Sequence, residues 1–183
     1  MTRTLILLPA ALFLALALSS CGGAGVPTSS LLSATSSKDA GPQDLSAEER
    51  MMLDATNAMR TQNQKCDGAV FKATTPLTWN GYLARSARAH TADMANQNYF
   101  DHVAPDGGTL ATRDNAAGYT GWTTLGENIV AGDDVSGFVQ RWMESPSHCK
   151  TLMDPKFREL GIGYVLKAGT TYRTYATQEF GTR

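Results

Sequence analysis

The clearest indication of the fold lies in residues 157–180, FRELGIGYVLKAGTTYRTYATQEF. Apolar and polar side chains alternate along much of it, the period-two pattern typical of β-strands. We predict one strand over residues 157–167, a turn at Ala168-Gly169 and a returning strand over residues 171–180. The chain is therefore expected to end in an antiparallel hairpin.

The sequence ahead of this hairpin is mainly helical in pattern. Four helix starts are marked by residues that cap helices: Ser46 with Glu49 as a capping box, Asn80, Thr109, and Asp133 or Asp134. The first helix is expected to end near Thr61 and the third at Gly118, and a short strand is expected over residues 128–131. Helices first and an antiparallel hairpin last predict an α+β fold with layers, not a parallel α/β sheet.

The bulk composition limits the kinds of partner. The chain has 183 residues, which suits one domain with appendages, and 16 basic side chains against 17 acidic ones. Removing residues 1–20 takes away only Arg3, so 15 basic and 17 acidic side chains remain. Because no basic block is present, no nucleic-acid partner is predicted. We expect the protein to be a monomer.

The N-terminus has the layout of an export signal. Arg3 precedes an apolar run over residues 5–18, which is too short to span a bilayer comfortably as a helix. The run ends in Leu18-Ser19-Ser20-Cys21, which resembles the lipobox of bacterial lipoproteins. We therefore predict a signal peptide at 1–20, a lipid on Cys21 that anchors the chain to a membrane, and export to the cell envelope, facing outside the cytoplasm.

A tether and a domain are predicted after Cys21. Residues 21–44 are rich in Gly, Ser, Ala and Thr and bury too little apolar surface to offset the entropy of ordering, so we predict a flexible linker. Residues 45–183 form the predicted folded domain. Two cysteines remain there, Cys66 and Cys149, and export would place both in an oxidising compartment, where they can form a disulfide. The alternative makes Cys149 a nucleophile beside His148.

A series of motifs runs along the domain: Pro76–Asn80, Tyr99–His102, Gly126–Ile129, Trp142–Cys149, Leu160–Tyr164 and Ala176–Gly181. In this series the chain is similar to the bacterial branch of the CAP superfamily. The module of that superfamily is also called the SCP domain and is named for cysteine-rich secretory proteins, antigen 5 and pathogenesis-related proteins of group 1. The resemblance implies a three-layer α-β-α sandwich with a central, mostly antiparallel sheet and a cavity near it.

The resemblance also implies candidate site residues. Eukaryotic relatives place two histidines and two glutamates in the cavity; here His102 and Glu127 match directly, whereas the other two positions fall near Ser145 and Tyr175. Bacterial members instead carry a Ser-Pro-x-His block, which supplies His148. We therefore expect the cavity to be lined by His102, Glu127 and His148, with Tyr175 or Gln178 on the neighbouring strand.

Two kinds of chemistry remain open for this set. His102 and His148, with a carboxylate, can ligate Zn²⁺ and leave a position for water, so zinc is the one cofactor considered. They can equally form a hydrogen-bonded cluster around water, and Glu127 could simply pin a loop. His90 lies on an apolar helical stripe and is expected to be a buried core residue.

Three functions follow from these expectations. The first is a binding module at the cell envelope, whose ligand is a small apolar molecule, a cell-wall component or another protein. The second is a hydrolase that uses a metal or a Glu127–His base on water; whether the protein is an enzyme stays open. The third is a structural envelope protein, in which the polar cluster only holds loops together.

Overall fold

The computed structural model describes residues 44–132 and 134–183. The predicted signal peptide, the Cys21 lipid site, nearly all of the predicted tether and Asp133 lie outside the described residues. No described helix is both long and apolar enough to cross a membrane. The elements in chain order are α1 (Ala47–Arg60), β1 (Gln64–Cys66), β2 (Ala69–Phe71), β3 (Thr78–Trp79), α2 (Gly81–Gln97), α3 (Leu110–Ala117), β4 (Thr124–Ala131), α4 (Val135–Glu144), α5 (Pro146–Met153), β5 (Glu159–Leu166) and β6 (Thr174–Thr182).

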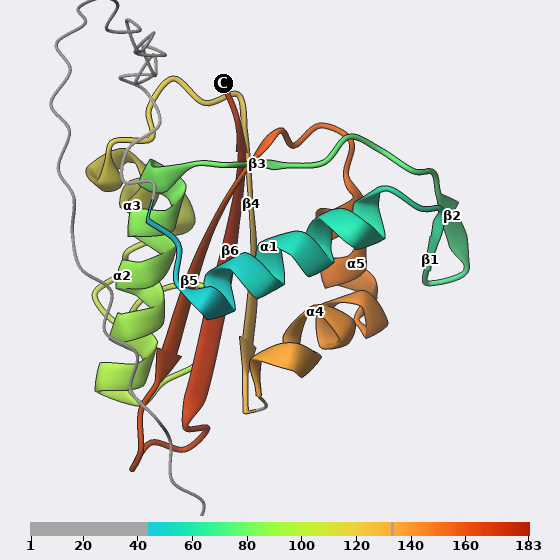
Figure 1. Cartoon of the computed structure of the whole chain (residues 1–183). Coiled ribbons are helices and arrows are strands. Elements are labelled where there is room, and N and C mark those ends of the chain that lie inside the picture. Colours follow the sequence, from blue (N-terminus) through green and yellow to red (C-terminus); the bar gives the residue numbers. More distant parts are fainter. Residues whose placement is uncertain (1–43, 133) are drawn as a thin grey trace, which may run out of the picture. The chain divides into compact units, whose positions relative to one another are not determined.

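A four-stranded sheet forms the middle layer, in the order β3-β5-β6-β4 (Figure 1). β5 and β6 pair antiparallel, as do β6 and β4, whereas the two-residue strand β3 runs parallel to β5. The predicted hairpin and the mostly antiparallel sheet are therefore confirmed. β1 and β2 form a separate small hairpin.

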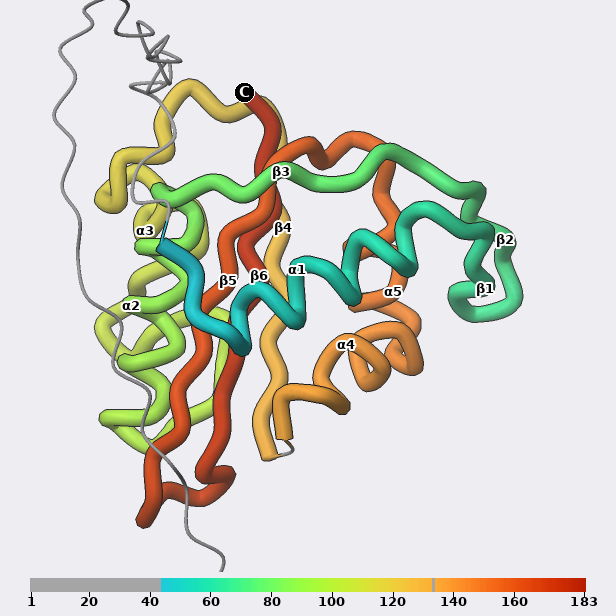
Figure 2. The backbone as a smooth tube through the Cα atoms, in the orientation of Figure 1, coloured from blue at the N-terminus to red at the C-terminus, as the bar shows by residue number. Residues whose placement is uncertain are grey.

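Helices cover both faces of this sheet, which confirms the three-layer arrangement (Figures 1 and 2). α2 and α3 lie on one face, and α1, α4 and α5 lie on the other. The close approach of α2 depends on glycine in β5. A Cβ atom on Gly161 would come within 2.0 Å of the Ala84 backbone nitrogen, and one on Gly163 within 2.5 Å of the Ala87 backbone.

The predicted caps start the helices. Ser46 and Glu49 form the capping box of α1, with distances of 3.1 Å from the Glu49 amide to Oγ and 2.9 Å from the Ser46 amide to Oε2. Thr109 forms a capping box with Thr112 at the start of α3, whereas the Asn80 side chain caps α2 by accepting from the amides of Tyr82 and Leu83. Gly118 ends α3 with a φ of 100°. These contacts satisfy amides that the first turn of a helix leaves free.

Three local predictions need correction. A fifth helix, α5, was not among the four predicted: Ser145 is its N-cap, and Pro146 occupies its first position, where the fixed φ of proline favours a helix. β4 begins at Thr124 and is longer than predicted. The turn between β5 and β6 is wider than two residues, because the Lys167 amide bonds to the Arg173 carbonyl at 2.7 Å.

The main hydrophobic core lies between the sheet and the α1, α4 and α5 layer. A smaller cluster around Met94, Ile129 and Tyr175 lies under α2. The predicted disulfide is present, with 5.6 Å between the Cα atoms of Cys66 and Cys149. It joins the small β1–β2 hairpin to α5, and it rules out the alternative in which Cys149 is a free nucleophile.

The free edge of β4 is covered by side chains of α4. The Trp142 indole donates to the Ile129 carbonyl at 3.1 Å, and the Arg141 guanidinium donates to the Ala131 carbonyl at 2.9 Å. Two carbonyls that a neighbouring strand would otherwise use are therefore already bonded.

Candidate functional site

Strand alternation sends consecutive residues of β4 to opposite faces of the sheet. Glu127 lies on the α2 side, directly opposite Glu179 of β6, whereas Asn128 lies opposite Gln178. Gly126, just before them, has no room for a side chain, because a Cβ atom there would come within 2.6 Å of the Phe157 ring. The Gly-Glu-Asn motif thus combines close packing with an inward-pointing carboxylate.

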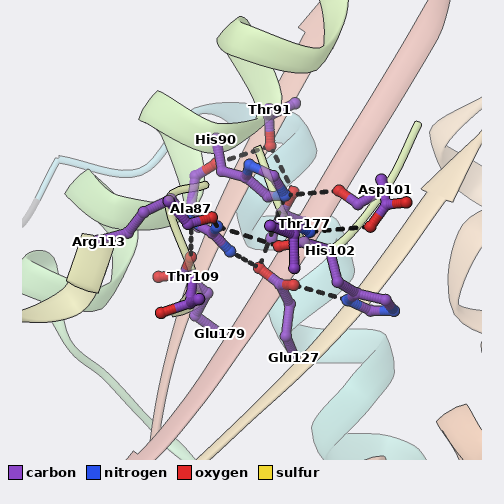
Figure 3. Close-up of polar contacts among 12 residues, drawn as sticks. Ala87, His90, Thr91, Asp101, His102, Thr109, Arg113, Glu127, Thr177 and Glu179 are labelled. Carbon is purple, nitrogen blue, oxygen red and sulfur yellow. Dashed lines mark hydrogen bonds and ion pairs between the residues drawn. The ribbon is translucent and has the colours of Figure 1, made fainter. Parts of the chain in front are cut away.

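Glu127 and His102 form a short, partly exposed pair (Figure 3). His102 Nδ1 lies 2.6 Å from Glu127 Oε1; the imidazole is 52% exposed and the carboxylate only 4%. The hydrogen bond to Glu127 raises the pKa of His102, and it fixes Nδ1 as the donor. The outer edge of the ring is therefore the chemically available part of this pair.

Arg113, on α3, holds Glu127 from the other side (Figure 3). Its Nη2 lies 2.5 Å from Glu127 Oε2, while Nη1 donates to the carbonyls of His102 at 3.1 Å and Gly108 at 3.0 Å. One guanidinium thus orients the carboxylate and also fixes the loop that carries His102. This contact supports the hypothesis that Glu127 pins a loop.

His90 is buried behind Glu127, as expected of a core residue. Its Nε2 lies 3.1 Å from the Asp101 carbonyl and 3.9 Å from Glu127 Oε2, and its Nδ1 faces the Tyr99 hydroxyl at 3.5 Å. Burial lowers the pKa of His90. A neutral imidazole here supports Glu127 sterically and donates to the backbone.

His148 lies on α5 and lines an open cavity of about 320 Å³ along the free edge of β4. Burial, together with the charge of nearby His102, lowers the pKa of His148. The cavity has an apolar strand wall, three aromatic side chains and a few polar groups. Its lining residues are Phe100, Ile129, Val130, Ala131, Arg141, Trp142, Ser145, His148 and Tyr172.

Tyr175 and Gln178, the two strand candidates, lie apart from the His102–Glu127 pair. Tyr175 is fully buried in the small cluster under α2. Gln178 lies on the opposite face of the sheet, where its Nε2 donates to Thr56 Oγ1 at 2.7 Å and its Oε1 accepts from Asn128 at 3.3 Å. The cavity roles predicted for His102, Glu127, His148, Tyr175 and Gln178 stay predictions.

The zinc prediction gains no support from the donor geometry. Among the described residues, no three His, Cys, Asp or Glu side chains are grouped to hold a metal ion. Both oxygens of Glu127 are already engaged, one by His102 and one by Arg113. No step proposed below uses a metal.

Sequence reasoning missed three residues of this region: Arg113, Asp114 and Glu179. The sequence leaves Arg113 either exposed or paired; it is paired, and its partner is the central carboxylate of Glu127. A signal for Glu179 was available, since it occupies a strand position on the same face as Tyr175 and Thr177. A carboxylate in such a strand requires a partner, and α3 supplies the candidates.

The fold and site together define a class: an α-β-α sandwich with a disulfide and an imidazole–carboxylate pair at the edge strand. The chain belongs to the CAP family, since the profile described as "Cysteine-rich secretory protein family" matches residues 53–180. This finding confirms the family predicted from the motifs.

Bacterial relatives agree with this assignment. "Uncharacterized protein YkwD" of Bacillus subtilis is 33% identical over 147 residues, covering 80% of this chain and 51% of that protein. "Uncharacterized membrane protein YlbC" of the same species is 31% identical over 133 residues, covering 72% and 34%. The chain therefore spans about half or less of these curated relatives.

Solved structures show the same fold. An extracellular SCP-domain protein of Bacillus anthracis is 30% identical with a TM-score of 0.62, covering 74% of this chain and 40% of that one. An outer surface protein of Borrelia burgdorferi has a TM-score of 0.61 at 17% identity, covering 76% of this chain and 96% of that one, and it supports the fold alone.

Proposed function

We propose that this protein is an exported, lipid-anchored binding module of the cell envelope. The sequence of residues 1–21 motivates export and the lipid on Cys21. The disulfide is the kind of bond that persists in an oxidising compartment outside the cytoplasm. The extracellular SCP protein of Bacillus anthracis is consistent with export.

The cavity beside the edge strand is the observation that carries the binding function. Its volume of about 320 Å³ lies in the range of small-molecule sites, and most of its wall is apolar. The ring centroids of Phe100 and Tyr172, which both line the cavity, lie 5.7 Å apart. His148 and Arg141 supply polar groups to the lining. The ligand class that fits is a small molecule with an apolar body and one polar or anionic group.

A cavity-filling substitution tests this proposal. Ser145→Phe should reduce binding of a fluorescent fatty acid, used as an apolar probe with an anionic head, because the new ring occupies the cavity. Ser147→Phe is the matched control, since Ser147 is exposed and does not line the cavity. Equal probe binding by wild type, Ser145→Phe and Ser147→Phe would dismiss this cavity as the site.

Membrane attachment needs its own experiment. Cys21→Ala should move the protein from the membrane fraction to the soluble fraction, because the acylated side chain is lost. Ser20→Ala retains the cysteine and should leave the protein in the membrane fraction. A Cys21→Ala protein that still sediments with membranes would reject the lipid anchor.

A hydrolase is the second candidate, and the His102–Glu127 pair favours it. A buried carboxylate behind a half-exposed imidazole is the arrangement of a general base that activates water. Any hydrolytic activity of the purified protein should disappear in Glu127→Gln and in His102→Ala while the fold persists. If both variants lose only stability and the wild type neither binds nor hydrolyses, the structural-protein alternative is favoured.

A further inference from the structure

Asp114 and Glu179 form a second acidic group, sealed behind the candidate site. Asp114 lies on α3, Glu179 lies on β6, and both are completely buried. Their carboxyl groups adjoin each other and Ser86 of α2. Neither residue has a role in the binding site proposed above.

These groups lack the hydrogen bonds that buried polar atoms normally form. All four carboxyl oxygens, Ser86 Oγ and Arg113 Nε are buried without a hydrogen-bond partner among the described residues. An ionised carboxylate can only accept, so two of them side by side cannot satisfy each other. A bound proton changes this, because it converts one carboxyl group into an O–H donor for the other.

The charges around the pair also favour a bound proton. Glu127 of β4 adds a third carboxylate, and His90 of α2 carries no compensating charge, because burial lowers its pKa. Arg113 of α3 is the cation that faces the pair, with its Nε 3.8 Å from Glu179 Oε1. However, its Nη2 already lies 2.5 Å from Glu127 (Figure 3). One guanidinium therefore faces three buried carboxyl groups.

We propose that Asp114 and Glu179 are a proton-binding site, in which the two carboxyl groups share one proton at neutral pH and leave Arg113 to hold Glu127 toward His102. Burial raises the pKa of both groups, and the neighbouring Asp114 raises that of Glu179 further. Like-charged neighbours in a dry site are known to retain a proton in this way. Glu179 and Asp114 are thus positioning residues for Glu127.

The proton has a measurable consequence for stability. The folded protein keeps a proton that the unfolded chain releases above the usual carboxyl pKa. The contribution of this pair to the free energy of unfolding is therefore fully present below the unfolded pKa, and it is lost as the pH rises toward the folded pKa. A neutral amide at either position supplies an N–H donor in place of the shared proton and does not ionise. This part of the pH dependence should therefore disappear in the amide variants.

Denaturant unfolding of the full chain from pH 5 to pH 8 tests the site. The unfolding equilibrium constant of the wild type, divided by that of Glu179→Gln, should rise with increasing pH by up to about tenfold per pH unit. Asp114→Asn should give the same rise, because the proton is shared, whereas Asp54→Asn on the exposed side of α1 should give a constant ratio. Constant ratios for all three variants would overturn the proposal.

Two further measurements hold even if the amide variants fold poorly. In wild-type protein labelled with ¹³C at the carboxyl carbons, the NMR signals of Asp114 and Glu179 should titrate at higher pH than those of the exposed carboxylates. If both signals titrate in the same pH range as the exposed groups, the proposal is overturned. The second measurement adds Mg²⁺ or Ca²⁺, or EDTA, at pH 7. Unchanged stability of the wild type supports a proton, whereas a metal-dependent gain in stability accompanied by a shift of the Asp114 and Glu179 carboxyl signals would replace the proton site by a cation site.

Discussion

Glu127 and Glu179 face each other across neighbouring strands on the same side of the sheet, yet their surroundings differ sharply. Glu127 accepts hydrogen bonds from His102 and Arg113, and it reaches solvent through the half-exposed imidazole. Glu179 accepts none from the described residues and is sealed beneath α2 and α3.

Strand position alone does not decide the charge of a buried carboxyl group. The number of hydrogen-bond donors that neighbouring segments supply decides it. The loop carrying His102 and the helix α3 both direct donors to Glu127. For Glu179 the same helix brings Asp114, a second acid. Substitutions at these positions and at their partners test this contrast.

Arg113→Met should have the largest effect, because it removes the cation that these carboxyl groups share. Removing one partner of a buried pair leaves an uncompensated charge and destabilises by about 3–5 kcal/mol. Denaturant unfolding at pH 7 measures the loss. The control Arg85→Met, on the exposed side of α2, should stay within about 0.5 kcal/mol. Similar losses for the two variants would show that Arg113 does not hold the cluster together.

Glu127→Gln should lower the pKa of His102 toward its ordinary value, because the amide cannot replace the carboxylate charge. Loss of a hydrogen bond to a charged group should destabilise by about 1.5–3 kcal/mol. The pKa of His102 is raised in the folded protein. The contribution of the His102–Glu127 pair to stability is therefore fully present below the unfolded pKa of His102, and it disappears as the pH rises through the folded pKa. The variant should therefore lose more stability at acidic pH than at alkaline pH.

Proton NMR of the imidazole Cε1–H follows this titration. Glu144→Gln, at the exposed end of α4, serves as the control and should leave the His102 titration in place. An unchanged His102 pKa in Glu127→Gln would mean that the 2.6 Å contact does not exist in solution.

Glu179→Leu should stabilise the protein at pH 8 by about 1–3 kcal/mol, because the fold no longer has to retain a proton that the unfolded chain releases at that pH. The same substitution at the opposite position, Glu127→Leu, should destabilise the protein, because Arg113 loses its carboxylate. Parallel denaturant titrations of the two variants should therefore give changes of opposite sign. Two losses of equal size would show that the two carboxyl groups have equivalent surroundings.

His102→Ala should have the smallest effect, within about 1 kcal/mol, because ion pairs with a half-exposed partner contribute little. Arg113 should continue to hold Glu127, so amide NMR spectra should change only around the loop. A loss approaching that of Arg113→Met would show that the imidazole, and not the guanidinium, is the main support of Glu127.

Much of the fold could be predicted because its signals are local. The helix caps depend on contacts only two or three residues away, as at Ser46, Asn80 and Thr109. In the final hairpin, apolar side chains recur at every second position. The sequence-based prediction does not include α5, because a proline between two serines is typical of helix caps and of turns alike and does not by itself mark the start of a helix. It shortens β4 because Gly126 and Glu127 interrupt the apolar pattern that marks a buried strand.

The site was predicted only in part, because its contacts join distant segments. The motifs supplied His102, Glu127 and His148, and the first two are in contact. No local pattern indicated that Arg113 would reach both Glu127 and the His102 loop, since these contacts depend on how α3 packs. Gln178 lies on the face of the sheet opposite Glu127, because side chains alternate along a strand and Gln178 pairs with Asn128.

The side chains that cover the free edge of β4 also affect how copies of the domain behave when crowded. An open edge strand is a template on which a second sheet can grow, and such growth leads to aggregation. Trp142 and Arg141 occupy two carbonyls of that edge, and α4 covers the strand beside them. These contacts oppose the edge-to-edge joining of domain copies that leads to continuous fibrils.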